Sequence, residues 1–143
     1  MREIVLDTET TGLDPKAGHK LVEIGCLELI NHIPTGGKLH LYINPEREMD
    51  PGAFEIHGLS TEFLAKYKPF RDHADEILSF LGESTLIIHN ASFDSKFLNI
   101  HKGGHIKVLL SWRVNTKSEL PRGALLAEMH SADPQNLIQF MLA

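Results

Sequence analysis

The chain has 143 residues, of which 42% are hydrophobic, 14 are Lys or Arg and 19 are Asp or Glu, so its formal net charge is −5. These values are typical of one soluble globular domain and exclude a chain that is disordered throughout. The single cysteine, Cys26, excludes an internal disulfide, and no apolar run approaches the roughly 18 residues of a membrane span, so we expect a cytoplasmic protein without a membrane partner.

The first part of the sequence predicts a strand followed by a hairpin. Ile4–Leu6 is a short apolar run typical of a buried strand, and Leu21–Ile30 is the second strand candidate. Pro34–Gly37 consists of turn-forming residues, which makes Leu39–Ile43 the returning antiparallel strand. The segment 45–58 that follows is predicted to be a loop with at most a short helix.

The next segments predict helices that alternate with strands. Pro69–Leu81 has apolar residues at helical spacing, a proline in its first turn and Gly82 at the position of a C-terminal cap. Thr85–His89 is a further apolar strand candidate, and Ser92–Asn99 opens another helix. A hairpin followed by alternating strands and helices predicts a mixed α/β fold.

The pattern after residue 100 is weaker. Ile106–Leu110 is a strand candidate, Gly123–Met129 fits one or two helical turns, and Asp133–Leu142 fits a last helix. No repeat or low-complexity segment divides the chain, so we expect a single domain.

Acidic residues are concentrated in the first hundred positions, which hold 16 Asp and Glu against 9 Lys and Arg. A negative charge argues against broad binding of a nucleic-acid backbone, but it is compatible with an enzyme that binds one phosphodiester through metal ions.

Asp7 and Glu9 stand at i and i+2, so both carboxylates point to the same side of a strand. Such a pair repels unless a cation lies between the two groups, and its hard oxygens suit Mg²⁺ or Mn²⁺. Asp94, just past a strand candidate, is a third acid that we expect at the same cleft.

Each of these residues also has a simpler interpretation. A bare Asp-x-Glu such as Asp7 and Glu9 is most often a strand end with two solvated acids. Asp94 follows a strand and precedes a helix, where an aspartate most often caps the helix. His57, in a predicted loop, is more often a surface histidine than a ligand. Taken singly, these residues do not define a site.

Taken as whole strings, five segments occur together in one order. They are Ile4–Leu13, Val22–Gly25, Ile43–Arg47, Ala53–Gly58 and Ile87–Asp94. In order and spacing these segments resemble the DEDD superfamily of 3′→5′ exonucleases, and within it the proofreading (epsilon) subunits of bacterial DNA polymerase III. The resemblance covers residues 2–99, so we expect one exonuclease-like domain over residues 1–143, with a well-matched core at 1–99 and a divergent tail at 100–143.

The resemblance implies a ribonuclease-H-like fold and phosphodiester hydrolysis with two metal ions, Mg²⁺ or Mn²⁺. Asp7, Glu9 and Asp94 match the catalytic and metal-binding acids of the family. Asp7, Thr8, Glu9 and His57 match positions that contact the terminal nucleotide. The partners that the resemblance implies are the 3′ end of single-stranded DNA and the catalytic subunit of DNA polymerase III.

The tail departs from the family pattern. The family's third motif is His-x4-Asp on a late helix, where the histidine is the general base and the aspartate completes the metal shell. The sequence beyond Asp94 contains no such pair, and its best-matching window has Arg122 at the histidine position and Ala127 at the aspartate position. His130 and Asp133 are three residues apart and are weak substitutes.

Three functions therefore stay open. The first is a proofreading-type exonuclease, impaired because the loss of a general base costs about 10²–10⁴-fold in rate. The second is a non-catalytic remnant or binding module with the same fold, and the third is a relative that trims RNA ends. A further departure is Gly52, where relatives commonly carry an acid that touches the terminal nucleotide.

Overall fold

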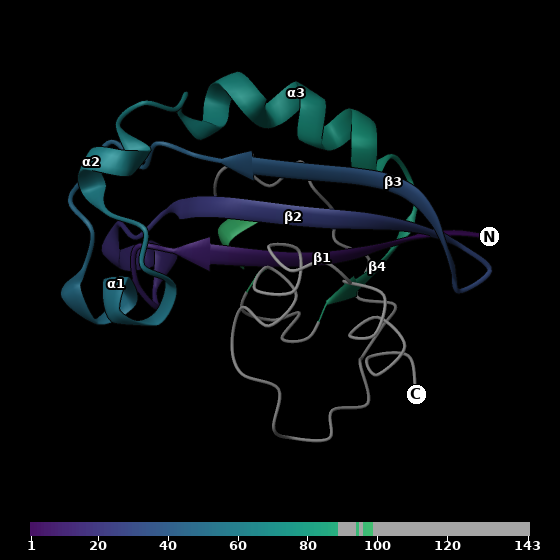
Figure 1. The fold of residues 1–143 in the computed structure, drawn as a ribbon, viewed down its shortest axis with the longest axis horizontal. Coiled ribbons are helices and arrows are strands. Elements are labelled where there is room, and N and C mark those ends of the chain that lie inside the picture. Colours follow the sequence, from purple (N-terminus) through teal and green to yellow (C-terminus); the bar gives the residue numbers. More distant parts are fainter. Residues whose placement is uncertain (89–93, 95, 99–143) are drawn as a thin grey trace.

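The computed structural model describes residues 1–88, 94 and 96–98. Its strands are β1 (Arg2–Thr10), β2 (Leu21–Ile30), β3 (Ile33–Tyr42) and β4 (Thr85–Ile88); its helices are α1 (Pro51–His57), α2 (Thr61–Leu64) and α3 (Phe70–Leu81), with a 3-10 turn, η1, at Pro15–Ala17. The strands form one sheet in the order β3-β2-β1-β4. β1 therefore lies inside the sheet, between antiparallel β2 and parallel β4 (Figure 1). The predicted mixed α/β class is confirmed.

The β2–β3 hairpin turns earlier than the sequence predicts. Pro34–Gly37, expected to be a turn, lies within β3, and the connection consists of Asn31 and His32, since Ile30 pairs with Ile33. Both connecting residues have positive φ, 48° and 67°, which is the conformation that a two-residue hairpin loop of the favoured twist requires. The prediction was wrong because a proline is tolerated in an edge strand, and β3 is an edge of the described sheet.

Two short helices occupy the segment between β3 and α3. α1 begins after Asp50, whose carboxylate accepts a hydrogen bond from the Gly52 N–H (2.8 Å), and it ends at Gly58 with φ of 70°. α2 begins after Ser60, whose hydroxyl accepts from the Phe63 N–H (3.1 Å). The sequence prediction of at most one short helix before Gly58 agrees with α1, and it missed α2.

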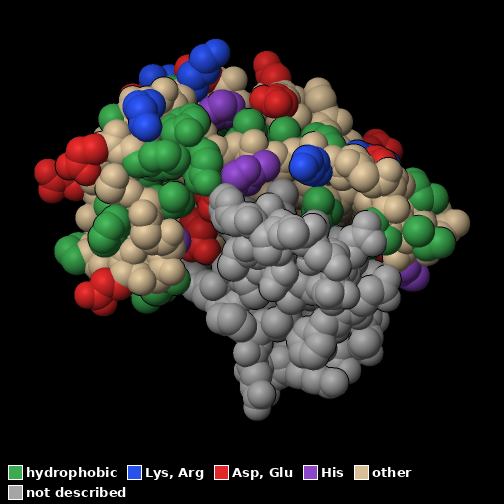
Figure 2. All heavy atoms as spheres, in the orientation of Figure 1, with side chains coloured by type: hydrophobic (Ala, Val, Ile, Leu, Met, Phe, Trp, Pro, Cys, Tyr) green, Lys and Arg blue, Asp and Glu red, His purple; other side chains and the backbone are tan. Residues whose placement is uncertain are grey.

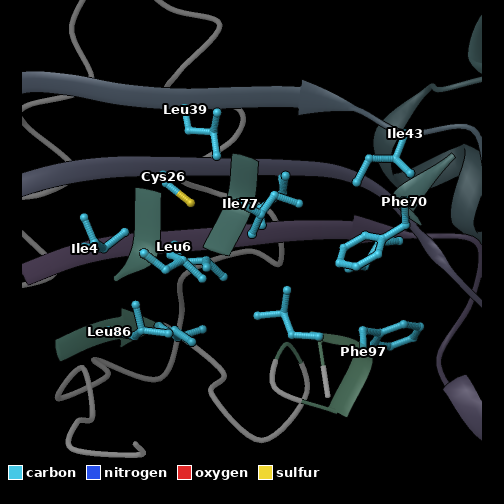
Figure 3. Close-up of a cluster of buried hydrophobic side chains, with 14 residues drawn as sticks. Ile4, Leu6, Cys26, Leu39, Ile43, Phe70, Ile77, Leu86 and Phe97 are labelled. Atoms are coloured by element: carbon cyan, nitrogen blue, oxygen red, sulfur yellow. The ribbon is translucent and has the colours of Figure 1, made fainter. Parts of the chain in front are cut away.

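The hydrophobic core lies between the sheet and α3. The predicted helix is confirmed with nearly the predicted bounds, and the Gly82 N–H closes it on the Leu78 carbonyl (2.9 Å). Figure 3 shows side chains of all four strands, among them Ile4, Leu6, Cys26, Leu39 and Leu86, gathered in one buried cluster with Ile77 of α3. Burial raises the pKa of the Cys26 thiol, so this cysteine is an inert part of the core.

The two faces of the sheet carry different side chains. The core residues of β1 are Ile4 and Leu6, both even-numbered. Because successive side chains of a strand point to opposite faces, the odd-numbered residues of β1 point away from α3. We call this second face the acidic face; it carries Asp7 and Glu9 of β1 together with Glu23 of β2, the Cα partner of Glu9.

Most of the predicted elements after β4 lie outside the described residues. These are half of the helix predicted at Ser92–Asn99, whose described residues 94 and 96–98 are helical, and all of three further elements: the strand at Ile106–Leu110, the turns at Gly123–Met129 and the helix at Asp133–Leu142. The third-motif positions Arg122 and Ala127, and the substitutes His130 and Asp133, lie there too. In the described part of the chain, no helix has both the length and the apolar character needed to cross a membrane.

Candidate active site at the end of β1

Asp7 and Glu9 lie near the C-terminal end of β1 on the acidic face. Their exposed fractions are 9% and 5%, so both carboxylates are nearly buried. The ladder to β2 places Asp7 opposite Gly25 and Glu9 opposite Glu23. One oxygen of Asp7 accepts a hydrogen bond from the Thr8 N–H (3.0 Å), which fixes the carboxylate against the backbone. The strand thus holds two acids on one face, two residues apart.

Asp94 reaches β1 through Thr8. The Thr8 hydroxyl donates a hydrogen bond to Asp94 Oδ1, and Asp94 is itself buried. Because Thr8 lies between Asp7 and Glu9 in the chain, this bond brings the third acid to the same end of β1. Asp94 arrives from the core face, where Phe97 of the same segment packs. Among the residues that the structure describes, no three His, Cys, Asp or Glu side chains form a group that could hold a metal ion, so the shared cleft remains a prediction.

His57 fastens α1 to the end of β1. Its Nε2 donates to the Thr10 carbonyl (3.0 Å), and its Nδ1 accepts from the Leu59 N–H (3.1 Å). The two bonds fix one neutral tautomer, because one ring nitrogen must donate while the other accepts. His57 therefore positions α1 beside the two acids, and its predicted contact with a terminal nucleotide stays a prediction.

A pocket of about 400 Å³ opens between α1 and the loop after β1. Apolar side chains form much of its wall, namely Leu13, Ala17, Ala53 and Ile56. Leu13 and Ile56 are 71% and 59% exposed, so both present apolar surface to the solvent. In Figure 2, acidic side chains are visible at the end of the molecule where α1 and α2 lie. Polar side chains complete the wall, namely Asp14, His19 and Asp50.

The loop after β1 is held by a compact set of contacts. The Thr11 hydroxyl lies 3.0 Å from His19 Nδ1 and accepts a hydrogen bond from the Lys20 N–H (3.0 Å). The His19 ring packs directly on Gly12, where a Cβ atom would lie 2.3–2.5 Å from three ring atoms. A residue without a side chain is therefore required at position 12 for the ring to close the loop.

Sequence reasoning did not single out Glu23 and His40. Glu23 is 3% exposed on the acidic face, and its Oε2 lies 3.0 Å from His40 Nε2. Burial, and then the negative charge of Glu23, raise the pKa of the neighbouring Tyr42. The signal was present in the segment Val22–Gly25, where a glutamate interrupts an apolar strand that is buried on both faces.

Comparison with known proteins identifies the family. A family model described as "Exonuclease" matches residues 4–108, which include Asp7, Glu9, the residues of the pocket and Asp94. The chain belongs to this exonuclease family.

Relatives of the family resemble the chain over most of its length. The DNA polymerase III subunit epsilon of Rickettsia felis is 54% identical over 113 residues, which are 76% of this chain and 49% of that protein. The chain thus spans about half the length of the curated relatives that it matches.

Solved structures of exonucleases share the fold. Exonuclease I of E. coli, solved with a dA16 oligonucleotide, superposes with a TM-score of 0.64 at 20% identity, over 72% of this chain and 24% of that chain. The nuclease domain of 3'hExo, a DEDDh family member solved with rAMP, superposes with a TM-score of 0.61 at 18% identity, over 76% and 62% of the two chains. The predicted ribonuclease-H-like fold is confirmed.

The chemistry of the donor set fits a divalent metal ion. Asp7, Glu9 and Asp94 supply carboxylate oxygens, which are the ligands that Mg²⁺ and Mn²⁺ prefer. Asp7 and Glu9 are buried on the acidic face and Asp94 is bonded to Thr8 between them, so a shared ion would require the Asp94 carboxylate to turn toward the pair. These residues are therefore the candidate metal ligands of the exonuclease domain.

Proposed function

We propose that this chain is a metal-dependent 3′→5′ exonuclease of the DNA polymerase III proofreading type, which hydrolyses the terminal nucleotide of single-stranded DNA. The observation that carries the proposal is the buried pair Asp7 and Glu9 at the end of β1, with Asp94 bonded to the residue between them. The pair lies within the residues matched by the exonuclease family.

The three acids would hold Mg²⁺ or Mn²⁺ at the end of β1. When bound, such ions lower the pKa of a water molecule and stabilise the charge that develops on the leaving oxygen. The chain itself orients the ligands: the Thr8 N–H fixes Asp7, and the Thr8 hydroxyl fixes Asp94. Burial of both residues excludes bulk water from this end of the strand.

The pocket beside α1 is the proposed site for the terminal base. Leu13 and Ile56 offer apolar surface to a base, while His57 keeps α1 beside the acids through its bond to Thr10. Gly52, which lines the same pocket, leaves room where an acidic side chain would reach the nucleotide. The oligonucleotide in the exonuclease I structure supports single-stranded DNA as the substrate class.

We propose the catalytic subunit of DNA polymerase III as the protein partner. Support comes from the relatives, which are named as subunits of that polymerase. We expect the two proteins to elute together from a size-exclusion column, in a peak that contains both in a fixed ratio. Neither protein alone should give a peak at that volume.

The experiment that tests the activity uses a single-stranded DNA labelled near its 5′ end, so that shortening from the 3′ end gives a ladder. We expect slow, EDTA-sensitive shortening with Mg²⁺ or Mn²⁺ that is lost in Asp7→Ala, because this change removes a metal ligand. An RNA strand of the same sequence forms the second arm, since a neighbour in the family was solved with rAMP. Shortening that persists in Asp7→Ala would show contamination and contradict the assignment.

A second candidate, a non-catalytic module with the same fold, is favoured by the unmatched third motif. The sequence beyond Asp94 has no His-x4-Asp. For this candidate we expect no shortening of DNA or RNA at any metal concentration, together with retained binding to the polymerase subunit.

A further inference from the structure

We propose that Glu23 is a positioning residue for Glu9, and that His40 holds Glu23 in the orientation that this role needs. The inference rests on the proposed function for the role of Glu9 as a metal ligand. It concerns two residues, on β2 and β3, that the proposed mechanism does not use.

Glu9 and Glu23 face one another across the β1–β2 ladder. They are Cα partners in an antiparallel pair, so their side chains leave the same face of the sheet. Residues directly opposite in such a pair have Cβ atoms about 4.5–5.5 Å apart. Both are nearly buried, with exposed fractions of 5% and 3%. The two side chains therefore leave the sheet from neighbouring positions that are shielded from bulk water.

Such an arrangement needs a stabilising partner. Like charges directly opposite on a sheet repel, and burial strengthens the repulsion because the local dielectric constant is low. His40 supplies the partner for Glu23, with Nε2 and Oε2 3.0 Å apart. His40 lies on β3, the strand beyond β2 when counted from β1. It therefore draws the Glu23 carboxylate toward β3 and away from Glu9.

The residues around Glu23 and His40 also favour a Glu23 carboxylate that points toward β3. His40 is the Cα partner of Gly25, and Gly25 is the partner of Asp7, so the row from Asp7 to His40 has no side chain in its centre. The charge of Glu23 acts on Tyr42, its own partner on β3, whose pKa it helps to raise after the larger effect of burial. Glu23 thus extends its charge over the β3 side of the acidic face.

The consequence for Glu9 is a restricted orientation. Repulsion from Glu23 directs the Glu9 carboxylate toward the Asp7 side, where the ion is proposed to bind. The fixed negative charge also adds to the attraction for a divalent cation. In Glu23→Gln the charge is lost, and the new amide N–H would instead bind the Glu9 carboxylate and draw it away.

The test measures Mn²⁺ binding to the whole chain without nucleic acid, by electron paramagnetic resonance of the free ion. We expect Glu23→Gln to raise the Kd for Mn²⁺ about tenfold, as the loss of one nearby charge at intermediate dielectric constant predicts. Glu23→Asp keeps the charge and should stay within about threefold of the wild type. If Glu23 had a purely structural role, Glu23→Gln and Glu23→Asp would have the same Mn²⁺ affinity whenever their thermal stabilities are equal.

Glu3→Gln is the matched control. Glu3 is also a buried carboxylate of β1 on the same face, and it is also bound by a histidine, with Oε2 2.8 Å from His32 Nδ1. It is six positions from Glu9, which is about 20 Å along a strand. This variant removes a buried carboxylate but leaves the Glu9–Glu23 pair intact, so its Mn²⁺ affinity should equal that of the wild type.

A metal-free double-mutant cycle separates this inference from the proposed function. Thermal unfolding in EDTA is compared for Glu9→Gln, Glu23→Gln and the double variant. Each single change should relieve the same repulsion and raise the thermal stability. The double variant should therefore gain less stability than the sum of the gains of the two single variants. Additive changes, or equal Mn²⁺ Kd values for wild type and Glu23→Gln, would overturn the role of Glu23. Mn²⁺ binding unaffected by Asp7→Ala would instead overturn the proposed metal site, while coupling in the cycle would still uphold the opposition of Glu9 and Glu23.

Discussion

Single residues at the end of β1 determine the shape of the site. Gly12 has no side chain, and the His19 ring occupies the space that a Cβ atom would need. The ring in turn lies within hydrogen-bond distance of the Thr11 hydroxyl, at 3.0 Å. The pocket wall next to Leu13 therefore depends on a contact that only glycine allows.

Gly12→Ala is expected to destabilise the chain by about 1–2 kcal/mol, because His19 must move and its bond to Thr11 is lost. Urea unfolding followed by circular dichroism measures the change. In a His19→Ala background the ring is absent, so the same Gly12→Ala substitution should cost little. A cost as large in that background would show that the backbone at Gly12, not the ring, is the constraint.

At the scale of elements, one glutamate ties three strands together at the hairpin end of the sheet. Glu28 of β2 accepts hydrogen bonds from the Thr35 hydroxyl of β3 (2.6 Å) and from Arg2 of β1. The Thr35 bond and then the Arg2 bond lower the pKa of Glu28. A lowered folded-state pKa means that the contribution to stability is present above the ordinary glutamate pKa and is lost as the pH falls through the lowered value.

We expect the thermal midpoint of Glu28→Gln to depend less on pH in the acid range than that of the wild type. The thermal midpoint of the wild type should fall more steeply than that of the variant as the pH drops below about 4.5. Glu83→Gln is the control, since Glu83 is exposed and takes part in none of the ion pairs recorded for the described residues. If the thermal midpoints of wild type and Glu28→Gln fall in parallel as the pH drops, Glu28 does not contribute to the loss of stability in acid.

The elements that the sequence predicts well are those with a strong period. β2 has the predicted bounds and α3 nearly so, because an apolar run and a helical stripe each admit one interpretation. The Pro34–Gly37 turn was misplaced because Asn31 and His32, which adopt positive φ, carry no glycine to mark them. α2 was missed because one helical turn after a serine cap leaves no periodic pattern.

At the scale of the whole molecule, the sequence locates the acids but not their arrangement. The i, i+2 spacing of Asp7 and Glu9 already placed them on one face of a strand. That Asp94 meets the Thr8 hydroxyl, and that Glu23 faces Glu9, follow from strand order and register, which no local pattern encodes. The terminal-base pocket likewise needed α1 to be placed against the loop after β1.

Activity of the whole chain should be restored in part by grafting the third motif. We predict that turnover is about 10²–10⁴-fold below that of a domain with a general base, and that Arg122→His with Ala127→Asp regains part of this. The assay is 3′ shortening of single-stranded DNA, with Asp7→Ala in the grafted chain as the control. No gain in the double variant would reject the alignment of positions 122 and 127 with the motif.

The position of β1 between β2 and β4 has a consequence for how the protein is made. β1 can pair with β2 as soon as a hairpin of about 30 residues has left the ribosome, but its parallel partner begins at Thr85, about 80 residues after Glu3. At synthesis rates of about 5–20 residues per second, one edge of β1 waits for several seconds after the strand emerges. During that interval the backbone beside Ile4 and Leu6 is open to pairing with another nascent chain. The strand that carries the acids therefore stays open along one edge until β4 emerges, after β2 has already paired on both sides with β1 and β3.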